Sequence, residues 1–222
     1  IVASVFFVFN MTGTVSPQDG SGWVRTLTIV IFTMMASVTT GQFAAVAFSL
    51  DGEGLWLMKS APISPSIYYF AKLAFVVTPG FGVLSVLFIM LSFFKTMPQY
   101  PMYVSIPAGF LMLSALCALL IMFDILKPDF NLRLSDIQYR KRRNPSKTII
   151  SVLGSQVGSV LLGIVFAFSE YHQYIPPFSR WTEKTAITIS LVLLGIIVIV
   201  IHIVAAKIAI KRIRFLFGEN AK

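Results

Sequence analysis

Residue types that perform acid–base, nucleophilic or metal chemistry are few in this sequence. Among 222 residues it has two histidines, His172 and His202, one cysteine, Cys117, and nine acidic residues. The histidines lack the spacing of metal ligands, and a single cysteine can form neither an internal disulfide nor a cysteine-based metal cluster. The sequence contains no G-x-x-x-x-G-K-[ST], no H-E-x-x-H and no G-x-S-x-G pattern. We therefore predict a protein that is not an enzyme and that binds no metal or cofactor of its own.

One polar segment carries residue types suited to acting on a partner protein. It reads Phe48-Ser-Leu-Asp-Gly-Glu-Gly-Leu-Trp-Leu-Met-Lys-Ser-Ala-Pro-Ile-Ser-Pro65. Asp51 can cap the start of a helix, and Glu53 favours its first turn. Pro62 ends that helix, and Ser64-Pro65 begins the next one. The expected product is a short, bent surface helix that could pass a push from a soluble partner to the adjoining elements. The alternative is an ordinary interfacial helix anchored by Trp56.

The elements that hold this segment follow from the composition. Apolar residues make up 56% of the chain, charged residues only 12%, and the mean hydropathy is +0.82. A soluble domain carries about 25% charged residues. The composition therefore excludes a soluble globular protein, a disordered chain and a collagen-like fibre, and it leaves a multi-span membrane protein.

Charged residues divide the chain into membrane-spanning lengths. No Asp, Glu, Lys or Arg occurs within 26–50, 73–94, 96–123, 148–169 or 185–206. Because about 20 apolar residues cross the hydrocarbon as a helix, each window predicts one span. The apolar stretch 1–9 is expected to be the end of a truncated first helix, so we expect the chain to be part of a larger protein. The predicted fold is an all-α bundle in one domain, 1–222, with about six spans, near 1–9, 26–50, 73–94, 103–123, 148–169 and 185–206.

Basic residues predict the orientation of the bundle. The segments 51–72, 124–147 and 207–222 carry 14 of the 18 Lys and Arg residues, and they alternate with segments that carry few. The positive-inside rule places these three segments, and with them the C-terminus, in the cytoplasm. We expect a multi-pass protein of the inner or plasma membrane.

The segment from Phe48 to Pro65, followed by Lys72 at the head of the next span, resembles a signature of ABC exporter permeases of the ABC-2-like type. In that family a pattern of the form Phe-Ser-x-Glu-Gly…Trp-Leu-Leu-Lys-Ser-x-Pro-Ile-Ser precedes a span. Here Asp51 stands in place of the glutamate. The resemblance implies a six-span half, here a C-terminal half, whose link between spans two and three contacts a separate ATPase subunit. It also implies a second permease half or a homodimer partner. The link is 51–72, and the residues expected to couple to the ATPase are Asp51, Glu53, Gly54, Trp56, Lys59, Pro62 and Pro65.

Two further patterns concern lipid and helix packing. The run Arg140, Lys141, Arg142 and Arg143 precedes a span, and it is expected to set topology and attract anionic lipid or to contact the ATPase subunit. Nucleic acid is not an expected partner, because no aromatic residues are interleaved with this run. In 148–169 small residues line one helix face, which predicts either a static close packing of helices or a sliding face; they are Ser151, Gly154, Ser155, Gly158, Ser159 and Gly163.

The span 73–94 contains a helix-breaking sequence, Thr78-Pro-Gly-Phe-Gly82. Pro79 removes a backbone donor and is expected to kink the helix, with Gly80 and Gly82 adding freedom, so this point is either a hinge or a simple bend.

Three functions are compatible with these features. The expected function is the membrane-spanning subunit of an ABC-type exporter, driven by ATP hydrolysis in a separate subunit. The first alternative is an ion-coupled secondary transporter, although that class places Asp or Glu within its spans and the charge-free windows here hold none. The second alternative is a membrane assembly subunit that transports nothing. The sequence does not indicate a substrate.

Overall fold

In the computed structural model, the described residues are 31, 33, 36–54, 60, 63–93, 99–129, 145–171 and 178–217. Within them every regular element is helical. A helical stretch that includes 36–44 leads into the short 3₁₀ helix η1, Ser49–Gly54. Four long helices follow, namely α4 Pro65–Phe93, α5 Gln99–Leu126, α7 Pro145–Tyr171 and α8 Glu183–Phe217, with a 3₁₀ turn, η4 Phe178–Arg180, before the last one.

The expected all-α fold is confirmed in the described residues, whereas the expected number of about six spans stays a prediction. In the part of the chain that the structure describes, three helical segments are long and apolar enough to cross a membrane, as expected of a membrane protein: Pro65–Val86, Ile106–Leu126 and Thr185–Phe217. Helix α7 adds a shorter apolar segment, Ile149–Leu161. The predicted span 1–9 and the first part of the predicted span 26–50 lie outside the described residues.

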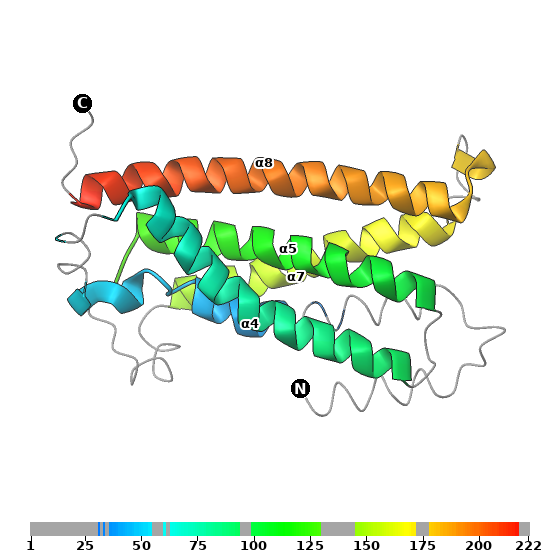
Figure 1. The fold of residues 1–222 in the computed structure, drawn as a ribbon, viewed down its shortest axis with the longest axis horizontal. Coiled ribbons are helices and arrows are strands. Elements are labelled where there is room, and N and C mark those ends of the chain that lie inside the picture. The colour runs from blue at the N-terminus through cyan, green and yellow to red at the C-terminus, as the bar shows by residue number, and fades with distance from the viewer. Residues whose placement is uncertain are drawn as a thin grey trace.

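The four long helices run roughly along one axis, and α5 lies at the centre (Figure 1). In the apolar window of α5 72% of the residues are buried, against 33% in α4 and 22% in α8. The outer surfaces of α4 and α8 expose large apolar side chains, such as Phe75, Val192 and Ile199. In water such a surface would be costly, whereas in lipid it is the expected exterior of a bundle.

Each of the four long helices begins before its predicted span, and α4 and α8 depart furthest from it. Helix α4 begins at Pro65, so Lys72 lies in its second turn and not at the head of the span. The hydroxyl of Ser64 accepts a hydrogen bond from the backbone N–H of Ile67 at 3.3 Å, which caps the helix as Ser64-Pro65 predicts. Helix α8 runs on to Phe217, because Lys and Arg are good helix formers and are favourable near a C-terminal helix end.

The small residues of α7 face its neighbours. Ser151, Ser155 and Ser159 are buried, and the hydroxyls of the latter two donate to the carbonyls one turn earlier, at 2.6 and 2.8 Å. A Cβ added to Gly154 would lie 2.9 Å from Leu116 of α5, and one added to Gly158 would lie 3.4 Å from Met112. The stripe therefore lets the two backbones approach closely; Gly163 lies further along the same helix.

Helix α4 is continuous through Pro79, and its ribbon bends partway along its length (Figure 1). The hydroxyl of Thr78 donates to the carbonyl of Ala74 at 2.8 Å, a contact that often accompanies bending. Gly80 is buried, and a Cβ added to it would lie 2.7 Å from Thr40 Cγ2 and 2.9 Å from Leu113 Cδ2. Gly82 has nothing within 4 Å of such a Cβ. Gly80 thus allows close packing of three elements, while whether the bend also moves stays a prediction.

These two glycines give a matched test of the packing. Gly80→Ala should destabilise the protein by about 1–3 kcal/mol relative to Gly82→Ala, because only the first methyl group overpacks the bundle. Gly82→Ala should raise the stability slightly, since alanine is the better helix former by roughly 0.5–1 kcal/mol. Thermal unfolding of both variants in the same detergent measures the difference. Equal unfolding temperatures would contradict the packing described around Gly80.

Candidate functional site

The segment singled out by the sequence begins at one end of the bundle, where the chain leaves its helical stretch. Residues 45–48 form turns, and η1 follows directly. Backbone hydrogen bonds carry the chain from one to the other: the N–H of Leu50 donates to Val46 at 2.9 Å and that of Asp51 to Phe48 at 3.1 Å. Phe48 is fully buried in the main apolar cluster, together with Tyr68 and Tyr69 of α4 and Ile121 and Ile125 of α5. The residues that directly precede the link are therefore part of the core.

A buried carboxylate fastens the residues just before the link to α5. Asp124, in the last turn of α5, is 1% exposed. Its Oδ2 atom accepts hydrogen bonds from the backbone N–H groups of Phe48 at 2.9 Å and Ser49 at 2.8 Å. Its Oδ1 atom accepts a hydrogen bond from the Ser49 hydroxyl, which in turn accepts one from the backbone N–H of Asp129 at 2.9 Å. Because a buried charge is tolerated only when it is well hydrogen-bonded, these contacts fix the beginning of η1 on α5.

A second carboxylate fastens η1 to α4. Asp51 accepts a hydrogen bond from the Tyr68 hydroxyl, and its Oδ1 atom lies 2.6 Å from Lys72 Nζ. The side chains of Lys72 and Asp51 are 21% and 15% exposed, so the pair is shielded from most of the solvent. Tyr68 and Lys72 are one helical turn apart, which brings both donors to the same carboxylate. The ammonium group also lies 5.8 Å from the centre of the Tyr68 ring.

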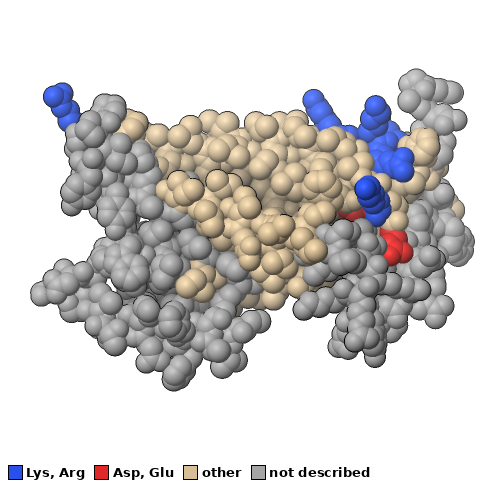
Figure 2. Space-filling model, turned by 180° about the vertical axis from the view of Figure 1, so that it is seen from behind, with Lys and Arg blue, Asp and Glu red and all other residues tan. Residues whose placement is uncertain are grey.

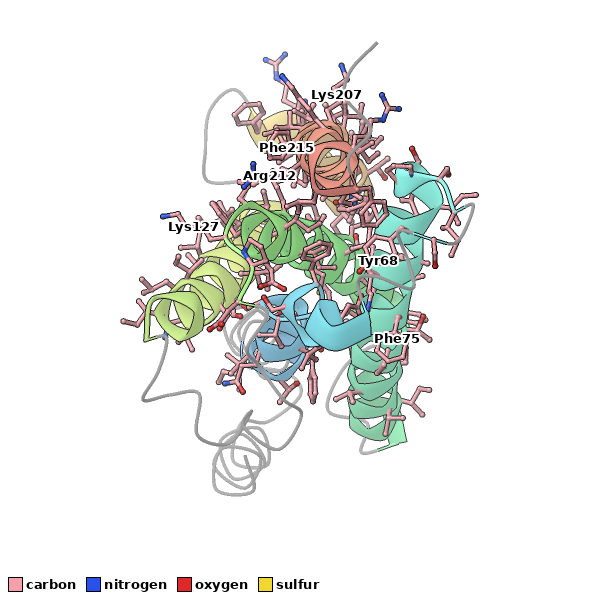
Figure 3. The ribbon with its side chains drawn as sticks, turned by 90° about the vertical axis from the view of Figure 1, so that its left-hand side faces the viewer. Tyr68, Phe75, Lys127, Lys207, Arg212 and Phe215 are labelled. Atoms are coloured by element: carbon pink, nitrogen blue, oxygen red, sulfur yellow. The ribbon has the colours of Figure 1, made fainter. Side chains whose placement is uncertain are left out.

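Aromatic contacts bring the end of α8 to the same place. The ring of Tyr68 makes edge contacts with Phe48 and with Phe217, the last residue of α8, each with ring centres 5.9 Å apart. Viewed from this end of the bundle, Tyr68 lies between α4 and α8, close to η1 (Figure 3). We call this group of Phe48, Ser49, Asp51, Tyr68, Lys72, Asp124 and Phe217 the link cluster. It joins η1, α4, α5 and α8.

The predicted coupling residues are described only in part. Asp51 belongs to the link cluster, and Pro65 is buried at the first position of α4. The backbones of Glu53 and Gly54 lie in η1. The other predicted coupling residues, Trp56, Lys59 and Pro62, lie outside the described residues, as does the basic run Arg140, Lys141, Arg142 and Arg143.

One expectation about Asp51 is wrong. We expected Asp51 to cap a helix start, but η1 begins two residues earlier, at Ser49, and the carboxylate at its N-terminal end is that of Asp124. The sequence analysis missed Ser49, Tyr68, Asp124 and Phe217. The one usable signal was the position of Asp124, an acidic residue directly after a charge-free window, where an unpaired charge would be costly.

A polar contact between Ser114 and His202 lies deeper in the bundle. Ser114 of α5 and His202 of α8 lie 3.1 Å apart, from Oγ to Nε2, and the same hydroxyl donates to the carbonyl of Leu111. Cys117 is buried in the apolar core. Among the described residues no group of three or more His, Cys, Asp and Glu side chains could hold a metal ion. The Ser49–Asp124, Asp51–Lys72 and Ser114–His202 contacts each join one helix to another.

The chain matches no protein-family model, no curated protein and no solved structure.

A double-mutant cycle tests the attachment of η1 to α5. Ser49→Ala and Asp124→Asn should each destabilise the protein, and together they should show a coupling free energy of about 1.5–3 kcal/mol, as for a hydrogen bond to a charged group. Unfolding by a denaturing detergent measures the four free energies.

Ser114→Ala is the matched control for that cycle, because Ser114 lies ten residues from Asp124 on the same helix, about 15 Å away. Its effect should add to that of Asp124→Asn within roughly 0.5 kcal/mol. A Ser49–Asp124 coupling as small as that of the control pair would show that the contact does not hold the link.

Proposed function

We propose that this chain is a transmembrane subunit of an ABC-type exporter, in which ATP hydrolysis by a separate cytoplasmic subunit drives alternating access. The link 51–72 contacts the ATPase subunit and transmits its conformational change to the spans. The chain supplies one half of about six spans, and a second half or a second copy completes the pathway. It resides in the inner or plasma membrane with its C-terminus in the cytoplasm.

The observation that carries this proposal is the attachment of the start of the link to two spans. A loop without contacts to the spans would bend under a force from the ATPase subunit and would not transmit it. Here the η1 end of the link is held to α5 through Asp124 and to α4 through Asp51, so a displacement of η1 must move those helices or break buried polar contacts. Such contacts favour rigid-body transmission over local yielding.

The charge distribution supports the orientation. Most of the Lys and Arg residues whose side chains are described gather at the end of the bundle that carries the link cluster (Figure 2). These residues are Lys72, Lys127, Lys207, Lys211, Arg212 and Arg214. Arg180 is at the other end, just before α8 begins. Under the positive-inside rule the link cluster faces the cytoplasm, where an ATPase subunit would meet it.

Co-purification tests the proposal. The chain is purified from its native membrane, and any ATPase with a Walker motif that co-purifies with it is identified and its amount is measured. Trp56→Ala and Lys59→Glu should each lower the recovered ATPase about tenfold, because they change the predicted contact surface of the link. Arg180→Gln, at the opposite end of α8, should leave the recovery unchanged.

The same experiment separates the alternatives. If both link variants kept full binding and full ATP-driven transport, the role assigned to 51–72 would be wrong. Transport supported by a proton or sodium gradient without ATP would identify an ion-coupled transporter. Absence of both an associated ATPase and any transport would indicate an assembly subunit.

A further inference from the structure

The end of the bundle that holds the link cluster also carries five cations that the cluster does not use. They are Lys127, directly after α5, and Lys207, Lys211, Arg212 and Arg214 of α8. The carboxylates of the link cluster are already engaged, Asp51 with Lys72 and Asp124 with the start of η1. Among the described residues none of the five cations forms an ion pair. We call these five residues the basic rim.

Three cations of the basic rim continue an apolar surface of α8. Lys207, Lys211 and Arg214 are exposed and spaced by four and three residues, so they lie along one face of the helix. Val200 and Val204, eight and four residues before Ile208, belong to the same side of the helix and are about half exposed, whereas Ile208 is 39% exposed. An exposed aliphatic stripe that ends in lysine and arginine matches the boundary between lipid chains and headgroups.

Arg212 is held in a fixed position at this boundary. Its Cζ atom lies 5.1 Å from the centre of the Phe215 ring, and Phe215 is 66% exposed. The Nε atom of Arg212 is buried and has no hydrogen-bond acceptor among the described residues. A guanidinium group that is partly removed from water, stacked on an aromatic ring and unpaired is well placed to bind a phosphate group.

Lys127 comes to the same site from α5. The ends of α5 and α8 pack through Ile125, Ala209 and Ile213, all buried in one apolar cluster. Lys127 is two residues beyond Ile125, and Arg212 directly precedes Ile213, so the two cations flank this contact. Figure 3 shows Lys127 and Arg212 on the same side of the bundle end, with Phe215 above them and Lys207 on the far side of α8.

We infer that the basic rim binds the phosphate headgroup of an anionic phospholipid in the leaflet at this end of the bundle. Arg212, Lys127 and Lys211 contact the phosphate, and the acyl chains lie along the exposed stripe of α8. A phospholipid is favoured over a soluble anion or an acidic protein because the cations are continuous with an apolar surface that only a lipid would cover. The site lies outside the link cluster and needs no ATPase subunit.

Lipid titration of the purified full-length protein tests this inference. In detergent, native mass spectrometry follows the binding of phosphatidylglycerol and of phosphatidylcholine, which differ in net charge. Phosphatidylglycerol should bind more tightly, and each of Arg212→Gln and Lys211→Gln should weaken its binding about fivefold, as expected for one basic residue at a membrane surface. Neither variant should change the binding of phosphatidylcholine.

Arg180→Gln is the matched control, because it removes one exposed charge at the opposite end of α8 and should leave phosphatidylglycerol binding unchanged. Lys211→Gln keeps the test valid if Arg212→Gln fails to fold, since the Lys211 side chain is exposed. Soluble glycerol phosphate should not displace the lipid. Equal affinity for the two lipids, an equal loss with Arg180→Gln, or displacement by glycerol phosphate would each overturn the inference.

Discussion

A carboxylate that is 1% exposed at the end of the central helix sets the arrangement of its surroundings. A charge in that place is costly unless donors surround it, and Asp124 obtains them from the Phe48 and Ser49 backbone and from the Ser49 hydroxyl. The need of the Asp124 carboxylate for these donors determines where the preceding helical stretch ends and η1 begins. It also determines that the link starts inside the bundle and not on its surface. The position of Asp51 then follows, which places its carboxylate beside Tyr68 and Lys72.

The end of the bundle that holds the link cluster differs from the rest of its length for physical reasons. At one end, buried carboxylates, an aromatic contact from Tyr68 to Phe217 and the basic rim gather within a short distance of the ends of α5 and α8. Along the bundle, close approach of helices depends on small residues such as Gly80 and Gly154, and the outward surface is aliphatic. In lipid no hydrophobic force drives helices together, so tight packing and polar contacts must do so. A tightly packed bundle with one polar end is compatible with the proposed permease.

The sequence predicts the coarse fold because each feature it uses is local. Charge-free windows anticipate α4, α5, α7 and α8, and Ser64-Pro65 marks the start of α4, since capping involves neighbouring residues. The link cluster could not be predicted in this way. Ser49 and Asp124 are 75 residues apart, and no local feature of either segment indicates that the two residues are in contact. From the sequence alone, Lys72 can be interpreted simply as the charged residue at the edge of a span. Only the fold places Asp51 beside it.

The most direct measurement of the central claim is the side of the membrane that the link faces. Single cysteines replace Ser60 in the link and Arg180 before α8, both exposed, in a protein whose Cys117 is changed to alanine. A membrane-impermeant maleimide is applied to intact cells and to inside-out vesicles. The account predicts that Ser60→Cys reacts in inside-out vesicles only and Arg180→Cys in intact cells only. Labelling of Ser60→Cys from outside the cell would contradict it, because no cytoplasmic ATPase could then reach the segment that Asp124 and Asp51 hold in place.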